Sequence, residues 1–385
     1  MTTLRLPRSL LASLFVIIAT AASMPAKAIS IVPTPPQLDA NSYILFDYAS
    51  GQLLAERDSS KAVEPASITK LMTVYVAFKE LSSGNLTLTD KVLISRNARH
   101  IEGSRMFVEL GSQVSVRDLL MGIIVQSGND ASIALAEHIA GSEGTFAQLM
   151  NQYAESLGMR NTNFNNATGL PSDGHLTTAR DIALLSSALI REFPEYYGWY
   201  STREYTYNGI TQQNRNTLLF RDRSVDGLKT GHTDAAGYCL AASAIRDNMR
   251  LVSVVLGTPS SNARVQATQA LLNFGFRFFQ SQKVLSSGKS LQDQRVWEGD
   301  MPTVALGASE SVFVTVPRGK RDSIETIVDL DGPLFAPLAK GTKVGFITVL
   351  MDGKELVKEP LVTLDEISEG AFMSRMKDKL LIMFN

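Results

Sequence analysis

Serine–lysine pairs spaced three residues apart are the first chemically suggestive feature of this 385-residue chain. On a helix, residues at this spacing share one face. The lysine amine can then take the proton of the serine hydroxyl, which makes the serine a nucleophile. The spacing occurs three times, at Ser67–Lys70, Ser286–Lys289 and Ser374–Lys377.

The surroundings favour the first pair. Ser67 precedes an apolar run that continues to Leu81, so we expect it in the first turn of a buried helix, at the positive end of the dipole. Partial burial and neighbouring cations would lower the pKa of Lys70 and favour the neutral form that a general base needs. Ser286 lies in a loop rich in serine and glycine, and Ser374 lies on a C-terminal helix. On this motif alone, a solvated lysine at a helix start remains the alternative.

Two further motifs strengthen the first pair. Ser127-Gly128-Asn129 falls at a break between two apolar helices, where a hydroxyl and a carboxamide can both point into a cleft. A second copy, Ser83-Gly84-Asn85, directly follows the Ser67 helix and is better interpreted as its C-terminal stop. Lys229-Thr230-Gly231 lies on a predicted strand after the turn Asp226-Gly227. The three motifs follow in this order, 60 and then 102 residues apart.

Other hydrolytic chemistries have little support in the sequence. It contains neither the Gly-x-Ser-x-Gly nor the His-Glu-x-x-His motif, and its cysteine and histidines do not have the spacing of a structural zinc site. A Ser-His-Asp triad has no local motif to support it. The single cysteine, Cys239, lies in an apolar stretch and is predicted to be a buried core residue rather than a reactive thiol.

The distribution of periodic segments predicts two folded units. Residues 29–279 mix helices and strands, which indicates an α/β (α+β) unit, whereas residues 280–365 contain short strands and indicate a small all-β unit. A hairpin is expected around Asp47–Gly51, and Thr178 is expected to cap a helix. The predicted helices span 68–81, 115–126, 131–140, 178–190 and 264–279, and the predicted strands span 228–230, 238–244, 251–256, 312–316, 326–330, 344–350 and 361–364.

The N-terminus has the pattern of an export signal. Arg5 and Arg8 precede an apolar run from Leu10 to Ala22, and Ala26-Lys27-Ala28 is an acceptable cleavage site. The run is shorter than the ~20 residues that span a bilayer, which disfavours a retained anchor. Removal of residues 1–28 leaves a net charge of −4, and the formal charge of the whole chain is −1. We therefore expect an exported protein that does not bind nucleic acid.

The C-terminal residues, 366–385, predict a basic amphipathic helix. Its apolar residues are Met373, Met376, Leu380 and Met383, with Phe372 and Phe384 at the ends, and Arg375, Lys377 and Lys379 add positive charge. Such a helix can lie in a membrane interface, and the alternative is a helix docked on the protein's own sheet. We favour peripheral contact with the periplasmic face of the inner membrane, because the chain is exported and the helix is terminal.

The ordered motifs resemble those of the serine penicillin-recognising enzymes. The chain is most similar to the low-molecular-mass penicillin-binding proteins that are D-alanyl-D-alanine carboxypeptidases. The similarity rests on the stretches 65–72, 126–130 and 226–233, and it covers essentially all of the chain after the signal. It implies a catalytic domain like that of the serine β-lactamases, with an antiparallel sheet flanked by helices, followed by the all-β domain and the tail. It implies no metal and no organic cofactor.

The resemblance also implies roles for individual residues. Ser67 would attack the penultimate D-alanine of a peptidoglycan pentapeptide and form an acyl-enzyme, with Lys70 as the base. Ser127, helped by Lys229, would pass a proton to the departing D-alanine. The backbone N–H groups of Ser67 and His232 would form the oxyanion hole.

Substrate binding falls to a second group of residues in the same resemblance. Asn129 would bind the substrate amide, and Thr230, within the Lys229-Thr230-Gly231 segment, would bind the terminal carboxylate. Arg264 matches the family position that also contacts this carboxylate. β-Lactam antibiotics would acylate Ser67, because they mimic the D-Ala-D-Ala amide. The tail ends at Asn385 without an aromatic-rich extension, which predicts weak or transient attachment to the membrane.

Three alternatives stay open at this point. A D,D-endopeptidase uses the same groups, although similar sequences of that kind often lack the all-β domain. A class A β-lactamase would carry a Glu-x-x-x-Asn loop between Ser127 and Lys229, and we find no convincing copy there. A non-catalytic protein that binds the cell wall is disfavoured because the nucleophile Ser67 is present.

Overall fold

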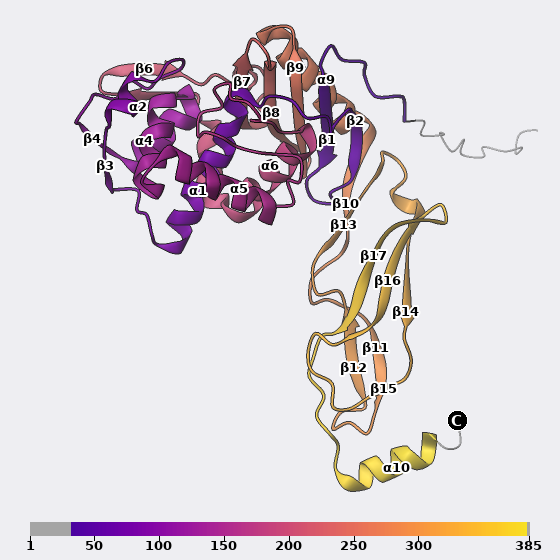
Figure 1. Ribbon diagram of the computed structural model, residues 1–385. Helices are drawn as coiled ribbons and strands as arrows, with labels where there is room; N and C mark the ends of the chain where they lie inside the picture. Colours follow the sequence, from indigo (N-terminus) through magenta and orange to yellow (C-terminus); the bar gives the residue numbers. More distant parts are fainter. Residues whose placement is uncertain (1–31, 383–385) are drawn as a thin grey trace, which may run out of the picture.

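The computed structural model describes residues 32–382, and Figure 1 shows two units joined end to end, with a terminal helix at the far end of the second. The predicted signal peptide, residues 1–28, lies outside the described residues. Within residues 32–382, none of the helices combines the length and apolar character needed to cross a membrane.

A five-stranded antiparallel sheet forms the centre of the first unit. Successive side chains of a strand point to opposite faces, so Cys239 and Ala241 enter one core while Leu240 and Ala242 enter another. Both faces are buried, which explains why the central strands β8 and β9 are largely apolar instead of alternating with polar residues. In sheet order the strands are β2 (Leu53–Arg57), β1 (Ser42–Asp47), β9 (Met249–Thr258), β8 (Gly237–Arg246) and β7 (Val225–Thr233).

Helices cover both faces of this sheet. The larger core lies between the sheet and a helical group that contains the long buried helix α1, and the smaller core lies under α9 (Figure 1). These elements are the 3-10 turn η1 (Ala66–Thr69), α1 (Lys70–Ser83), α2 (Arg96–His100), α3 (Val116–Met121), the π-helical turn η2 (Gly122–Gln126), α4 (Asn129–Ala140), α5 (Glu143–Ser156), α6 (Ala179–Glu192), α7 (Pro194–Tyr197), the 3-10 turn η3 (Gly198–Ser201), α8 (Leu218–Arg221) and α9 (Ser261–Phe278). A two-stranded antiparallel sheet of β3 (Lys91–Leu93) and β4 (Gln113–Ser115) and a hairpin of β5 (Glu204–Tyr207) and β6 (Ile210–Gln213) complete the unit.

The second unit is an all-β domain, as predicted. Its main sheet has the order β14-β16-β17-β12-β11-β15, and β10 pairs with β13 in a separate ribbon. The β16–β17 hairpin turns at Asp352-Gly353, where both residues adopt positive φ. The elements are β10 (Phe279–Leu285), β11 (Ser290–Trp297), β12 (Thr303–Gly307), β13 (Val312–Pro317), the 3-10 turn η4 (Arg321–Ser323), β14 (Ile324–Leu330), β15 (Leu334–Phe335), β16 (Lys343–Met351) and β17 (Lys354–Thr363).

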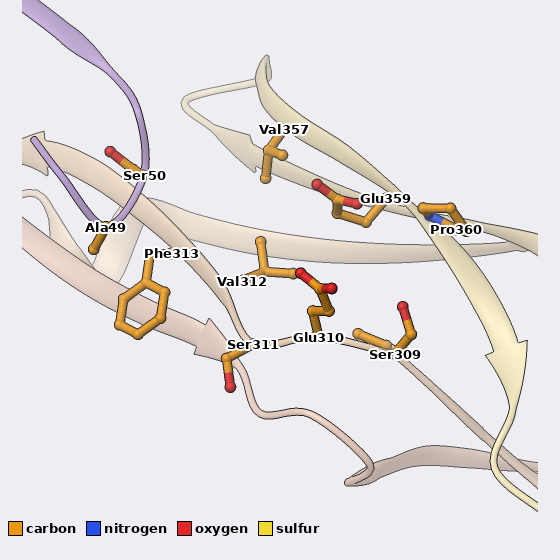
Figure 2. Close-up of a pocket in the computed structure, with 11 residues that line it drawn as sticks. Ala49, Ser50, Ser309, Glu310, Ser311, Val312, Phe313, Val357, Glu359 and Pro360 are labelled. Carbon is orange, nitrogen blue, oxygen red and sulfur yellow. The ribbon is translucent and has the colours of Figure 1, made fainter. Parts of the chain in front are cut away.

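A buried polar contact joins the two units. Thr315 Oγ1 of β13 donates to Asp47 Oδ2 at 2.8 Å and lies 2.6 Å from Ser50 Oγ, in the turn between β1 and β2. Figure 2 shows the adjoining cavity of about 170 Å³, with the side chains of Glu310 and Glu359 beside it. No serine–lysine pair lines this cavity, so the chemistry predicted above lies elsewhere.

The terminal helix α10 (Phe372–Ile382) contacts the β domain through its polar side. Asp378 accepts a hydrogen bond from the backbone N–H of Glu298 at 2.8 Å and pairs with Arg295 at 3.4 Å, and Arg375 pairs with Glu298. The apolar residues face solvent, and the Met373 side chain is 77% exposed. A helix docked in the ordinary way would show the reverse arrangement.

Several local predictions are confirmed. The hairpin at residues 47–51 joins β1 to β2, the Thr178 side chain caps α6 by accepting from the N–H of Asp181, and Gly84 ends α1 in the left-handed conformation. Cys239 is fully buried. Several boundaries were wrong: α4 begins at Asn129 rather than 131, α9 begins at Ser261 rather than 264, and β17 begins at Lys354 rather than 361.

Candidate active site

The predicted nucleophile lies on a constrained turn. Ser67 is in η1, directly after Ala66, whose φ of +47° is in the left-handed region that a side chain seldom adopts. Two glycines allow the neighbouring chain segments to pack against this turn. A Cβ on Gly231 would lie 3.0 Å from the Pro65 carbonyl oxygen, and one on Gly169 would overlap the Ala66 carbonyl. The segments that contain Gly231 and Gly169 therefore pack against the turn from two sides.

The Lys70 amine is buried and lies within hydrogen-bond reach of Ser67. Its Nζ lies 2.9 Å from Ser67 Oγ and 2.5 Å from the carbonyl oxygen of Thr168, and its side chain has no solvent exposure. Burial lowers the Lys70 pKa to about 7, and this effect outweighs the opposing pull of the Asp130 and Glu143 carboxylates. A large fraction of the amine is therefore neutral near pH 7 and can accept the proton of Ser67.

A second lysine is buried on the edge strand β7. Burial lowers the pKa of Lys229 well below its ordinary value, and the positive charges of Lys70, Arg264 and Arg215 lower it further. Its Nζ donates to the carbonyl oxygen of Thr230 at 3.0 Å. Ser67 and Thr230, the neighbours of the two lysines in their motifs, line the same cleft, so the two motifs meet in one site.

Ser127 ends the π-helical turn η2 in a strained conformation. Its φ is +67°, and the cost of a non-glycine residue in this region is of the order of 1–3 kcal/mol. The Oγ atom is buried and has no hydrogen-bond partner among residues 32–382. An unsatisfied buried hydroxyl on a strained residue is typical of a functional position, and π-helical turns often occur at such sites.

Asn129 holds a neighbouring loop through its side chain and its backbone. Its Nδ2 donates to the Glu102 carbonyl oxygen, and its backbone N–H donates to the Ser104 carbonyl oxygen, both at 2.7 Å. The next residue, Asp130, accepts hydrogen bonds from the backbone N–H groups of Met106, Phe107 and Val108. The Ser-Gly-Asn-Asp segment thus fixes the loop that forms one wall of the site.

These residues surround a cleft of about 310 Å³ in the first unit. Six of the nine residues predicted from the sequence line it directly, namely Ser67, Ser127, Thr230, Gly231, His232 and Arg264. The other three, Lys70, Asn129 and Lys229, are buried, and their contacts adjoin the lining. The structure therefore places all nine predicted residues at one site.

Arg264 is less solvated than a typical arginine at a helix start. Its guanidinium donates to the Gly231 carbonyl oxygen at 3.1 Å, and its Cζ lies 5.5 Å from the ring centre of Tyr238. The Nε atom is buried and lacks a partner among the described residues. The His232 ring stacks on the same tyrosine, with centroids 3.9 Å apart.

Comparison with known proteins identifies the family of the chain. The D-alanyl-D-alanine carboxypeptidase family profile matches residues 29–260, and the profile of the penicillin-binding protein 5 C-terminal domain matches residues 279–369. The chain belongs to the D-alanyl-D-alanine carboxypeptidase family. It is thus an enzyme of the serine peptidase class, as the resemblance implied.

Individual relatives match both units of the enzyme. D-alanyl-D-alanine carboxypeptidase DacC of Escherichia coli is 44% identical, and the match covers 91% of this chain and 90% of the relative. The crystal structure of penicillin binding protein 5 from Haemophilus influenzae is 43% identical with a TM-score of 0.84, and covers 88% of this chain and all of that one. A D-alanyl-D-alanine endopeptidase of Pseudomonas aeruginosa is 34% identical over only 60% of this chain and 75% of its own.

Four residues that line the cleft were missed by the sequence prediction: Ser104, Arg215, Tyr238 and Ser261. Arg215 is the most informative of them. The buried side chains of Asn214 and Asn216 tie its segment to the carbonyl oxygens of Thr202 and Gly227. The segment around Arg215 has no apolar periodicity that would indicate a helix or a strand. The two flanking asparagines are the only local signal that could have indicated a functional position.

Proposed function

We propose that this enzyme removes the terminal D-alanine from peptidoglycan pentapeptides and that Ser67 is its nucleophile. The observation that carries the assignment is the 2.9 Å contact between Ser67 Oγ and the buried Lys70 Nζ, whose pKa is lowered to about 7. A nucleophile beside a base of matched pKa is the arrangement that covalent catalysis requires.

Acylation would begin when the Ser67 hydroxyl transfers its proton to the neutral Lys70 amine. Ser67 Oγ then adds to the carbonyl carbon of the penultimate D-alanine, and backbone N–H groups of Ser67 and His232 stabilise the oxyanion. In comparable enzymes, loss of one such donor costs ~2.7–4 kcal/mol of transition-state stabilisation. When the C–N bond breaks, the D-alanine nitrogen takes a proton through the Ser127 hydroxyl, whose Oγ has no competing partner among the described residues. Water then hydrolyses the ester and regenerates Ser67.

Selection of a terminal residue requires recognition of a free carboxylate. The cleft is electropositive, because the guanidinium groups of Arg264 and Arg215 line it. The Thr230 hydroxyl and the Arg264 guanidinium are the groups we assign to this carboxylate, and Asn129 to the substrate amide. A β-lactam carries a comparable carboxylate beside its strained amide, so we expect it to acylate Ser67 as well.

Mass spectrometry after mixing with benzylpenicillin tests the assignment. We expect a long-lived adduct on Ser67 that is absent from Ser67→Ala. Rapid turnover without an adduct would instead indicate a β-lactamase. Release of free D-alanine from a pentapeptide, without cleavage of cross-linked dimers, would separate the carboxypeptidase from the endopeptidase.

We also propose that the enzyme is exported and contacts the inner membrane through α10. The polar side of the helix is held against the β domain by Asp378 and Arg375, while Met373, Met376 and Leu380 face outward. The helix lies at the end of the β domain away from the catalytic unit (Figure 1), so the β domain would act as a spacer. We retain residues 29–279, 280–365 and 366–385 as the proposed division of the exported chain.

Removal of residues 372–385 tests the membrane contact and leaves the hydrogen bonds of Ser368 and Gly370 in place. We expect the truncated enzyme to move from the membrane to the soluble fraction and to keep its reaction with benzylpenicillin. Unchanged fractionation would contradict the proposed anchor.

A further inference from the structure

A buried histidine lies behind the Ser67–Lys70 pair, and none of the roles assigned above uses it. His175 belongs to the long loop between α5 and α6, and its side chain is 2% exposed. Its Nε2 lies 2.9 Å from Thr69 Oγ1, and its Nδ1 accepts a hydrogen bond from the backbone N–H of Asn165 at 3.1 Å.

The two contacts define the tautomer of the ring. Nδ1 accepts from a backbone N–H and therefore carries no proton, so the proton lies on Nε2, which donates to Thr69 Oγ1. Burial lowers the His175 pKa to about 4. The ring is therefore neutral under the conditions in which Lys70 acts as a base, and both of its hydrogen bonds are formed.

Each of these contacts involves a segment that touches or precedes Lys70. Thr69 is the preceding residue in the chain. The loop that His175 closes also carries Thr168, whose carbonyl oxygen lies 2.5 Å from Lys70 Nζ. Asn166 Oδ1 accepts from the N–H groups of Thr168 and Gly169 and so fixes the direction of that carbonyl.

We propose that His175 is a positioning residue for the base: by joining Thr69 to the loop of Thr168, it keeps the Lys70 amine directed at Ser67. This proposal rests on the proposed roles of Ser67 and Lys70. The ring would not touch the substrate, and its contribution would be to keep the space around the amine fixed and dry.

Loss of the Thr69 contact should change the pKa of Lys70, and this change distinguishes a positioning role of His175 from a role in fold stability alone. A looser loop admits water around Lys70, which weakens the desolvation that lowers its pKa. The carboxylates of Asp130 on α4 and Glu143 on α5 favour the charged amine, so desolvation is the effect that keeps it neutral. With less desolvation, the Lys70 pKa rises and less neutral base is present near pH 7.

The test measures the rate of Ser67 acylation by benzylpenicillin as a function of pH in five variants. Thr69→Val removes the hydroxyl at nearly constant shape, and Thr69→Ser retains it. His175→Gln can place an amide N–H near the position of Nε2, whereas His175→Asn can satisfy only Asn165. His138→Asn, on the exposed end of α4, is the control for loss of a histidine.

We expect Thr69→Val and His175→Asn to be acylated about tenfold more slowly near pH 7, with the midpoint of the pH profile raised by about one unit. Thr69→Ser, His175→Gln and His138→Asn should stay within about threefold of the parent enzyme. Circular dichroism and thermal melting report whether each variant is folded.

The proposal is overturned if Thr69→Val and His175→Asn, when folded, keep the parent midpoint, whatever their melting temperatures. That result would assign His175 a purely structural role. Failure of the proposed function looks different, because the parent enzyme itself would then form no adduct on Ser67.

Discussion

The cleft and the tail helix depart from the usual distribution of polar and apolar residues in opposite ways. In the cleft, Lys70 and Lys229 are buried without an ion-pair partner among the described residues. On α10, Met373 and Phe372 are exposed while the charged Asp378 contacts the protein. Buried charges and exposed apolar surfaces both cost stability in water. These two departures are the observations that support the two proposals made above, a reaction in the cleft and membrane attachment at the tail.

Lys70→Met should produce the largest change and would show what the buried charge contributes. Methionine fills nearly the same volume without an amine, so acylation of Ser67 should fall by roughly 10²–10⁴-fold. Because a buried amine without an ion-pair partner among the described residues is replaced by an apolar group, the melting temperature should stay the same or rise. Stopped-flow acylation and calorimetry measure the two effects. A variant that lost both activity and stability would contradict the view that Lys70 serves catalysis rather than folding.

Arg215→Ala should have an intermediate effect that is confined to the cleft. The loss of one cation near the expected carboxylate should raise KM for the pentapeptide about tenfold, since hydrogen bonds to charged groups contribute ~1.5–3 kcal/mol. We expect little change in kcat. Arg203→Ala, on another exposed arginine of the same unit, serves as the matched control. Equal KM values in the two variants would remove Arg215 from the site.

Asp378→Asn tests the tail helix α10, and it should have the smallest effect of the three substitutions. Its ion pair with Arg295 is partly exposed, and such pairs contribute about 0–1 kcal/mol. The melting temperature and the rate of acylation should hardly change. If the outward direction of the apolar residues depends on this contact, binding to anionic vesicles should weaken by about threefold. Stronger binding would show that the contact restrains the helix from the membrane.

The sequence was sufficient for the features that depend on local periodicity. The motif around Ser67, the cap at Thr178 and the turn at Asp352-Gly353 all follow from short-range chemistry, and the structure contains them. Eight of the nine predicted site residues converge because the three motifs lie on elements that pack against one another: η1 with the start of α1, the break before α4, and β7. Arg264 joins them from α9, which packs on β8 and β9.

Tertiary contacts explain what the sequence did not reveal. Helix α5 (Glu143–Ser156) was not predicted, and its Glu143 accepts a hydrogen bond from the Ala167 N–H behind Lys70, a contact that only the tertiary fold creates. His175 and Arg215 lie in segments without periodicity, and their positions depend on partners more than 80 residues away, Thr69 and Val125. The strained φ of Ala66 likewise results from packing against Gly169, which no local pattern encodes.

The central claim is that a neutral, buried Lys70 activates Ser67, and the pH dependence of acylation tests it most directly. The folded-state pKa of Lys70 is lowered from 10.5 to about 7, so the active neutral form grows as the pH rises through 7. The second-order rate of benzylpenicillin adduct formation on Ser67 should therefore increase with pH, with a midpoint near 7, and then level off. A rate that is independent of pH across this range, or an adduct that persists in Ser67→Ala, would contradict the account.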